Sequence, residues 1–553
     1  MGKYSIGIDY GTLSARALLV NLENGKEEAS AVFEYPHGVL SEKFINGEKL
    51  PDHYALQDPS DYTRALIHTV SELLLSSSVR PEDIVGIGID FTSCTILPID
   101  QNGTPLCMKE EFKNEPHAYV KLWKHHSAQK YADLLSEKWA DEAWIRDYGG
   151  KISCEWVLPK IMEIAEEAPH IFKAADRFIE AGDWIVSQLI GGESHSACMA
   201  GFKGLWNDHD GYVFSSAASV SNSFDPMLKS LVGTKLSEHI SRPGSAAGTV
   251  TPEYAALTGL SSKTPVSVCI IDAHASLPAA GITSDGKMLM IIGTSTCHIL
   301  MSEEKKQVSG ICGVVKDGLI PGLYCYEAGQ AAVGDIFDWI VKNCVPATYI
   351  QEAKEQNITL HQLLRRKASR LTAGESGLLA LDWHNGNRSI LTDYDLSGLI
   401  LGLTLNTKPE EIYRALIEAT AFGSKIIIDN FRENGVAVNE LYAAGGIAEK
   451  DEMTMQIYAD VLGCTIRVCG SKQSGALGSA MFGAVAGGYF SSMHEAAKVM
   501  ANVGSKEYVP NPNSAHVYEE LYKEYKALHD YFGTKSGVMH RLKEMKRSAA
   551  KTE

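Results

Sequence analysis

Two short segments with the same pattern, one in each half of the chain, constrain the fold most strongly. Residues 4–12 form an apolar run of β type that ends in a carboxylate, a glycine and a hydroxyl, and residues 288–296 repeat the run, the glycine and the hydroxyls. The two glycines, Gly11 and Gly293, lie 282 residues apart in a chain of 553. A strand-and-turn unit repeated at half the chain length predicts two related domains.

The chemistry of these turns suits a phosphate group. Glycine adopts backbone angles closed to other residues, so main-chain N–H groups beside Gly11 can face an anion. The apolar run at 14–21 predicts that the first turn belongs to a hairpin. Asp9 could hold a hydrated divalent cation, which prefers oxygen ligands. The alternative is an ordinary hairpin with a surface carboxylate, but the recurrence of the pattern favours a site for phosphate and metal.

Composition excludes several classes of function. Hydrophobic residues make up 45% and charged residues 22% of the chain, as in ordinary globular proteins. The net charge of −17 argues against nucleic acid or an anionic membrane as the main partner. No apolar run is long enough to span a bilayer, and the first strand leaves no room for a signal peptide, so we expect a cytoplasmic protein.

Two further apolar segments end in residues that can bind or react. Residues 84–94 are predicted to form an apolar strand that ends in polar residues and Cys94, and the carboxyl ends of strands are where α/β folds bind ligands. The buried strand predicted at 266–271 ends in Asp272. On local pattern Asp272 is predicted to cap a helix rather than to act as a catalytic group, because Asp is a good N-cap.

Other polar residues have weaker local signals. Lys203 stands alone in a compact loop, which is more typical of a solvent-facing charge. His125 and His126 are predicted to be a solvated pair on a helix rather than a metal site. Glu327 lies near the end of a predicted strand, and the strand at 441–444 stops on Gly445 and Gly446.

With these segments in order, residues 6–489 resemble the carbohydrate kinases named for their Phe-Gly-Gly-Tyr signature. The resemblance is carried by residues 9–12, 153–164, 272–275, the Gly293 turn and the Gly445–Gly446 turn. It implies an α/β fold of two ribonuclease-H-like domains, as in actin, hexokinase and Hsp70, which flank a cleft for ATP and sugar. The expected domains are 1–280, which binds sugar, and 281–553, which binds nucleotide.

The resemblance also implies a role for each matching residue. Asp272 becomes the general base, which replaces the capping interpretation. The other implied contacts are Gly11, Thr12, Gly293 and Thr294 with the β- and γ-phosphates of ATP, Asp9 with Mg²⁺, Gly445 and Gly446 with adenosine, and Cys94, Lys203, Asp272 and Glu327 with the sugar. Relatives often place Asn after the paired glycines, whereas this chain has Glu449 and Lys450, which leaves the contacts with adenine open.

The implied activity is ATP-dependent phosphorylation of L-ribulose, or of D-ribulose, to ribulose 5-phosphate in arabinose catabolism. Another pentulose such as xylulose, or a polyol, is the nearest alternative substrate. A chaperone ATPase would need a peptide-binding module, for which too few residues follow Tyr489, and an inactive sugar sensor could dispense with Asp272. The oligomeric state is left open, with a homodimer as one possibility.

Overall fold

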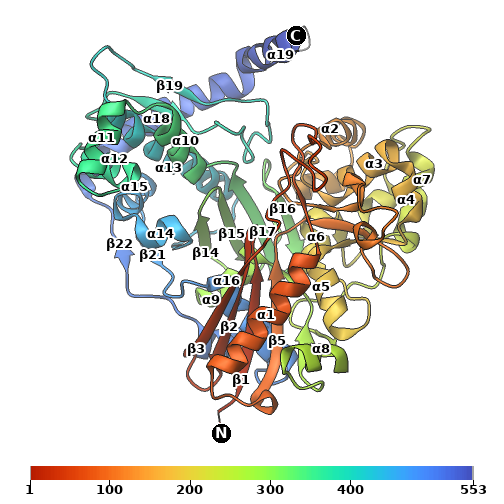
Figure 1. Cartoon of the computed structure of the whole chain (residues 1–553). Helices are drawn as coiled ribbons and strands as arrows, with labels where there is room; N and C mark the ends of the chain where they lie inside the picture. Colours follow the sequence, from red (N-terminus) through yellow and green to blue (C-terminus); the bar gives the residue numbers. More distant parts are fainter. Residues whose placement is uncertain (1, 551–553) are drawn as a thin grey trace.

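The first half of the chain is built on a seven-stranded mixed sheet. A computed structural model describes residues 2–550 (Figure 1). The path of paired strands runs β11-β12-β5-β1-β2-β3, with β13 paired to β5 beside β12. The strands are β1 (Tyr4–Tyr10), β2 (Ser14–Asn21), β3 (Glu27–Glu34), β5 (Ile84–Phe91), β11 (Ala246–Thr249), β12 (Pro265–Ser267) and β13 (Ile270–Ile271).

A second seven-stranded sheet follows in the other half, with the path β16-β17-β15-β14-β20-β21-β22. Its strands are β14 (Lys287–Ile292), β15 (Thr296–Ser302), β16 (Gly313–Lys316), β17 (Tyr324–Gln330), β20 (Glu440–Ala444), β21 (Ile466–Val468) and β22 (Glu507–Tyr508). Helices pack around it, among them α10 (Gly334–Asn343), α11 (Ala347–Glu355), α12 (Leu360–Ala368), α13 (Pro409–Glu433), α14 (Gly446–Lys450), α15 (Glu452–Leu462), α18 (Pro512–Asp530) and α19 (Val538–Ala550).

The two sheets share one local arrangement. β1 pairs antiparallel with β2 and parallel with β5, and β14 pairs antiparallel with β15 and parallel with β20. In each hairpin the glycine N–H donates across the turn, Gly11 N to Ser14 O at 3.0 Å and Gly293 N to Ser295 O at 2.9 Å, and the second turn is one residue shorter. The predicted hairpin and its repeat in the second half are therefore confirmed.

A long insertion in the first half forms a hydrophobic core of its own. It contains the four-stranded sheet β4-β7-β6-β8, with β4 (Leu56–Gln57), β6 (Ile96–Ile99), β7 (Val120–Lys121) and β8 (Arg177–Glu180). Its helices include α2 (Gln129–Lys138), α3 (Val157–Glu167), α4 (Pro169–Ala174), α6 (Ala197–Lys203) and α7 (Asp225–Thr234). In Figure 1 this unit lies on the opposite side of the molecule from α10 to α13.

One helix from late in the chain belongs to the first sheet. α16 (Ser474–Ala486) packs on β1 and β5 and against α9 (Asp272–Ala279). Glycines permit this contact, because a Cβ at Gly7 would lie 1.8 Å from Ala476 O and one at Gly88 would lie 1.8 Å from Ser479 O. The division at residues 280 and 281 remains a prediction, but the core around the first sheet includes side chains from beyond it.

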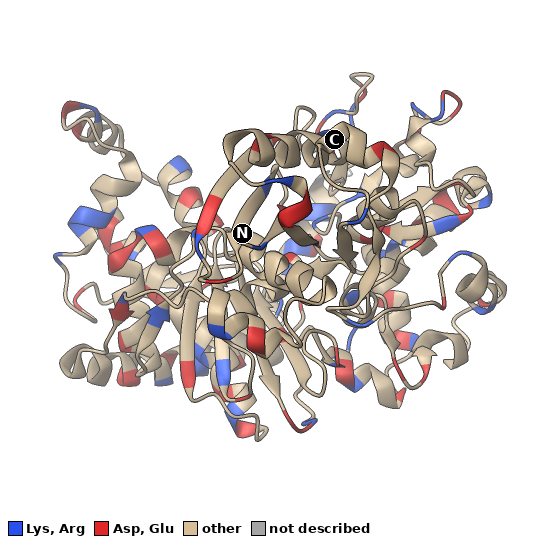
Figure 2. Cartoon of the chain, turned by 90° about the horizontal axis from the view of Figure 1, so that it is seen from below, with Lys and Arg blue, Asp and Glu red and all other residues tan. Residues whose placement is uncertain are grey.

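Charge does not by itself mark a site on the fold. Figure 2 shows acidic and basic positions interspersed over helices and strands. Among the helices of residues 2–550, none combines the length and apolar character that crossing a bilayer requires. The informative charges are those inside the molecule.

Candidate active site

One cavity of about 550 Å³ brings together every residue that the sequence singled out for a ligand. Its walls come from both seven-stranded sheets and from the insertion in the first half. The predicted residues on its walls are Asp9, Gly11, Thr12, Cys94, Lys203, Asp272, Gly293, Thr294, Glu327, Gly445 and Gly446. The contacts of these residues with ligands remain predictions, whereas their common location is observed.

The two hairpin turns are held by different neighbours. Thr12 Oγ1 accepts a hydrogen bond from Trp123 Nε1 at 3.1 Å, which ties the first turn to the insertion. The second turn is braced by the start of α10, where Val333 N donates to Thr294 O at 2.7 Å and Gly334 N donates to Gly293 O at 3.0 Å. Both turns are therefore fixed before any ligand arrives.

A third turn follows β20 at Gly445 and Gly446. Gly445 has φ = +95°, and a Cβ there would lie 2.6 Å from Ile292 O, so only glycine fits without a shift. A Cβ at Gly446 would meet no neighbouring atom within 4 Å, so the space beside this glycine is open. Glu449 and Lys450 also line the cavity, which places the unusual pair near the region expected for adenine.

Asp272 is the first residue of α9 and is half-buried at the cavity wall. Ile271 occupies the N-cap position, so the prediction that Asp272 caps the helix is wrong; its Oδ1 instead accepts a hydrogen bond from Ala273 N at 2.7 Å. Burial, followed by the negative charge of Asp9, raises the pKa of Asp272 to about 7. A carboxylate of this kind can exchange a proton near neutral pH.

Asp9 and Asp90 stand side by side at the ends of the paired strands β1 and β5. Burial raises the pKa of Asp9, against the opposing effect of Arg16, whose Nη1 lies 3.6 Å from Asp9 Oδ2. Burial and the Asp9 charge raise the pKa of Asp90 well above its ordinary value, and Asp90 Oδ1 is buried with no hydrogen-bond partner in the described chain.

These two carboxylates fit a hydrated divalent cation. Within residues 2–550 no group of three or more His, Cys, Asp or Glu side chains could enclose a metal. Mg²⁺ does not need such an enclosure, since it is usually bound by one or two carboxylates, substrate phosphates and retained water. The orphaned Asp90 Oδ1 and the mutual repulsion of the two acids are features that a cation would relieve.

Lys203 and Glu327 form a buried ion pair on the cavity wall. Lys203 Nζ lies 2.7 Å from Glu327 Oε1, and His274 Nε2 lies 3.1 Å from Glu327 Oε2. Burial favours the neutral forms, but each charge stabilises the other, so the pKa of Lys203 is raised and that of Glu327 is lowered. Both groups are ionised, and the prediction from local pattern that Lys203 faces solvent is wrong.

Trp123, Glu155 and Arg388 are among the residues of this wall that the sequence did not single out. Glu155 Oε1 lies 3.1 Å from Arg388 Nη2 and 3.0 Å from His126 Nε2. Arg388 comes from the loop between β18 (Leu379–Leu381) and β19 (Leu399–Leu401). Glu155 lies inside the 153–164 block that carries the family resemblance, which was the available signal, whereas Arg388 had none.

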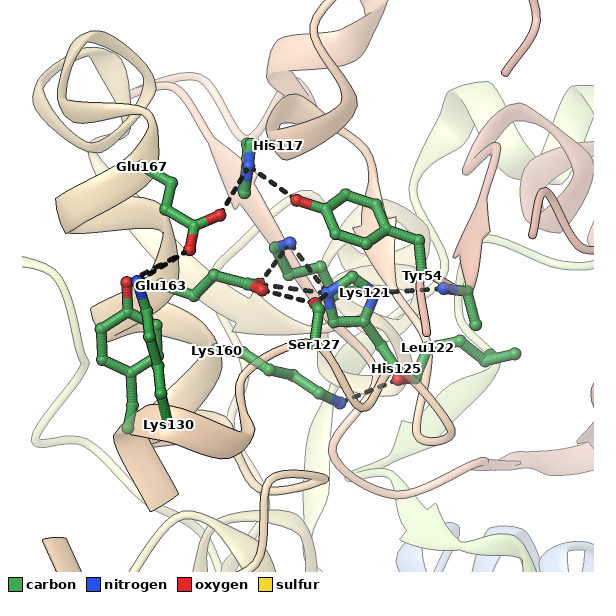
Figure 3. Close-up of polar contacts among 12 residues, drawn as sticks. Tyr54, His117, Lys121, Leu122, His125, Ser127, Lys130, Lys160, Glu163 and Glu167 are labelled. Atoms are coloured by element: carbon green, nitrogen blue, oxygen red, sulfur yellow. Dashed lines mark hydrogen bonds and ion pairs between the residues drawn. The ribbon is translucent and has the colours of Figure 1, made fainter. Parts of the chain in front are cut away.

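A buried polar network anchors the segment that carries Trp123 (Figure 3). Lys121 Nζ lies 2.7 Å from Glu163 Oε2, and neither side chain is exposed. His125 Nδ1 accepts a hydrogen bond from Ala55 N at 3.1 Å, so Nε2 carries the proton and faces Glu163 Oε2 at 3.1 Å. His125 is fully buried and outside any helix, so the prediction of a solvated helical pair is wrong for it.

Lys160 connects this network to the cavity. Its buried Nζ donates to Cys94 O at 2.7 Å and to Leu122 O at 2.8 Å. The two carbonyls belong to the segments that carry Cys94 and Trp123 to the cavity wall. Lys160 therefore fixes these two segments relative to each other.

Two repeated sheets close on one cavity, and each contributes a glycine turn to it. Residues 4–278 match the N-terminal domain, and residues 288–487 the C-terminal domain, of the FGGY family of carbohydrate kinases. The chain belongs to this family.

Two relatives with nearly full-length similarity are both named ribulokinase. A protein named ribulokinase from Bacillus licheniformis is 52% identical over 541 residues, which cover 97% of this chain and 98% of that one. A ribulokinase from Geobacillus thermodenitrificans is 50% identical over 99% of this chain and 98% of its own.

Solved structures share the fold at low sequence identity. The xylulose kinase of Rhodospirillum rubrum aligns with a TM-score of 0.79 and 23% identity, covering 97% of this chain and 100% of that one. A glycerol kinase of Plasmodium falciparum with ADP aligns with a TM-score of 0.74 and 17% identity, covering 95% and 98%. The expected α/β fold of two related domains is confirmed.

Proposed function

We propose that this protein transfers the γ-phosphoryl group of ATP to the C5 hydroxyl of L-ribulose, and of D-ribulose, giving ADP and ribulose 5-phosphate for arabinose catabolism. The name shared by its near-full-length relatives supports the substrate. The observation that carries the proposal is structural: Asp272, the Lys203–Glu327 pair and all three glycine turns line one cavity. The alternative is another pentulose, such as xylulose, or a polyol.

Asp272 acts as the general base in this proposal. Its Oδ1 is held by Ala273 N, which leaves Oδ2 to accept the proton of the sugar hydroxyl. The hydroxyl oxygen forms a bond to the γ-phosphorus as the bond from that phosphorus to the β,γ-bridging oxygen breaks, and ADP leaves with the bonding electrons. A pKa near 7 keeps a large fraction of the carboxylate ionised at neutral pH and still basic enough to take the proton.

Lys203 and Glu327 orient the sugar. Lys203 offers donors and Glu327 offers acceptors, a combination that a polyol needs and an apolar wall could not supply. His274 holds the second oxygen of Glu327 from behind. Cys94 lies on the same wall and adds a small, weakly polar contact surface for the sugar.

The phosphates of ATP lie between Gly11–Thr12 and Gly293–Thr294, and adenosine lies at Gly445–Gly446. Backbone N–H groups at such turns stabilise the charge that spreads over the transferred phosphoryl group. Asp9, with Asp90 beside it, would hold Mg²⁺, which supplies positive charge to the phosphate oxygens when bound. Water would compete with the sugar as the acceptor, so closure of the cleft around both substrates protects the transfer.

The proposal extends to the location and the assembly of the protein. ATP is an intracellular metabolite, and the proposed activity therefore places the protein in the cytoplasm. A homodimer remains a prediction, which sedimentation of the purified protein would test.

The decisive experiment is a substrate panel. ADP release would be measured with Mg²⁺ and ATP in the presence of L-ribulose, D-ribulose, L-xylulose, D-xylulose, ribitol or xylitol. We expect the highest kcat/KM with L-ribulose and no ADP release without sugar or without a divalent cation. A higher kcat/KM with a xylulose or a polyol would replace the proposed substrate, and no release with any sugar would contradict the kinase activity itself.

A further inference from the structure

Two ion pairs join the two halves of the molecule across the cavity. In the first, Lys203 of the first half binds Glu327 of the second half at 2.7 Å. In the second, Glu155 of the first half binds Arg388 of the second half at 3.1 Å. The polarity is reversed between the pairs, and all four residues line the cavity. The proposed function uses only the first pair.

The Glu155–Arg388 pair has unused hydrogen-bonding capacity. Arg388 donates to Glu155 through Nη2, whereas its Nη1 makes no hydrogen bond with the described residues. Both hydrogen bonds to the Glu155 carboxylate end on Oε1, so Oε2 accepts none within residues 2–550. The side chains are only 9% and 11% exposed, and buried polar atoms normally find partners. A polar ligand in the cavity would supply them.

The guanidinium of Arg388 is held in place. It lies over the Trp123 ring, 5.9 Å from its centroid. It also passes over Gly329, where a Cβ would come within 3.4 Å of Arg388 Cδ. A planar cation fixed on an aromatic ring presents its remaining N–H groups in a defined direction, as a site that recognises oxygen atoms requires.

The charges of the Lys203–Glu327 pair act on both Asp272 and Glu155. After burial, the charges that act most on Asp272 are those of Asp9 and Glu327. The positive charges that act most on Glu155 are those of Arg388, His126 and Lys203, in that order. Together they hold the pKa of Glu155 at about 2, although burial raises it. The Lys203–Glu327 pair thus acts electrostatically on both Asp272 and Glu155, and all of these residues line the one cavity.

We propose that Glu155 and Arg388 bind the C1–C2 end of the sugar, opposite the hydroxyl that faces Asp272. This inference rests on the proposed function, in which the C5 hydroxyl is phosphorylated. A ketopentose carries a hydroxyl on C1 and a carbonyl on C2. Arg388 donates to these oxygens and Glu155 Oε2 accepts from the C1 hydroxyl, so the pair selects an open-chain ketose over sugars that lack either group.

The experiment measures binding by calorimetry for three ligands: L-ribulose, 1-deoxy-L-ribulose, which lacks the C1 hydroxyl, and ribitol, which lacks the carbonyl. The variants are Arg388→Gln, Arg388→Lys and Glu155→Gln. Lys151→Gln is the matched control, because Lys151 Nζ also bridges the halves, donating to Thr392 O at 3.3 Å, but is exposed and lies off the cavity wall. Thermal unfolding confirms that each variant is folded.

We expect Arg388→Gln and Glu155→Gln to weaken L-ribulose binding by about ten-fold or more, since each removes a charge-assisted partner. The preference of the wild type for L-ribulose over at least one analogue should fall to within about two-fold in Arg388→Gln. Arg388→Lys keeps the charge but loses the planar fork, so it should also lose that preference. Lys151→Gln should bind all three ligands like the wild type, and KM for ATP should stay within about two-fold in every variant.

Equal weakening of all three ligands by Arg388→Gln would overturn the inference, because the arginine would then act without contacting the C1–C2 end. Unchanged L-ribulose binding in both Arg388 variants, or the same loss in Lys151→Gln, would overturn it as well. These results differ from failure of the proposed function, which would show as no L-ribulose-dependent ADP release by the wild type.

Discussion

The two sheets have the same local strand arrangement, yet their surroundings differ. The hairpin turn of the first sheet is tied to the insertion by the bond from Trp123 to Thr12. The hairpin turn of the second sheet is tied to the start of α10. The repeated part of the fold thus supplies two similar turns, and the segments added to each sheet decide what lies beside them. The residues proposed for adenosine follow β20 of the second sheet, whereas those proposed for the sugar come from both halves of the chain.

The strongest test of this division concerns Asp272, which the first sheet places at the cavity. Asp272→Asn keeps an oxygen that can accept the hydrogen bond from Ala273 N but cannot take a proton at neutral pH. We expect kcat to fall by about 10²–10⁴-fold, the usual contribution of a general base. Rapid-quench and steady-state assays would measure the loss, and calorimetry should show that sugar and ATP still bind. Near wild-type turnover in a folded variant would remove Asp272 from the chemistry.

The next test removes one partner of the Lys203–Glu327 ion pair at a time. Lys203→Ala and Glu327→Ala should each raise KM for the sugar by roughly 5- to 150-fold, equivalent to about 1–3 kcal/mol for orphaning a buried charged partner. The double variant should lose less than the sum, because the two charges stabilise each other. KM for ATP should change little. Unchanged sugar KM in both single variants would exclude the pair from the sugar site.

A smaller effect is expected from a substitution in the turn that is proposed to bind adenosine. Gly445→Ala forces a Cβ to within 2.6 Å of Ile292 O at φ = +95°, so the turn must shift. We expect KM for ATP to rise by about ten-fold while sugar binding without nucleotide is retained. Gly463→Ala is the control, since it also has positive φ but has open space around it and lies outside the cavity. An equal change in KM for ATP in the control would indicate a general effect of strain.

The smallest expected effect is on stability. The pKa of Asp272 is about 7 in the folded protein against an ordinary value of 3.8, so the folded state holds the proton more tightly. Its contribution to the free energy of unfolding is therefore full below pH 3.8 and is lost as the pH rises to 7. Asp272→Asn should unfold at a temperature about 1–4 °C above the wild type at pH 8, with a smaller difference at pH 5. A difference independent of pH would contradict the shifted pKa.

The sequence predicted the turns well because their signal is local. A strand that ends in glycine and a hydroxyl can be recognised without its neighbours, and Gly11 and Gly293 lie where the pattern placed them. Lys203 and His125 were misplaced for the opposite reason. Each is buried only because a distant carboxylate, Glu327 or Glu163, compensates its polar group.

For Asp272 and Arg388, too, the local sequence pattern was not enough to predict their place in the site. The local pattern of Asp272 is that of a helix cap, and only its place within a family pattern pointed to chemistry. Glu155 and Arg388 are 233 residues apart in the chain, so no local spacing of residues predicts their contact. Pairings across a cleft depend on how two separately folded surfaces meet, which a periodic or compositional signal does not contain.

The position of α16 has a consequence for how the protein is made. Its glycine-lined contacts with β1 and β5 fill the first core, but residues 474–486 are translated long after those strands. A ribosome that has made only the first 280 residues has exposed a sheet with one apolar face uncovered. Until α16 is translated, that face remains exposed apolar surface, which makes an incomplete chain prone to aggregation.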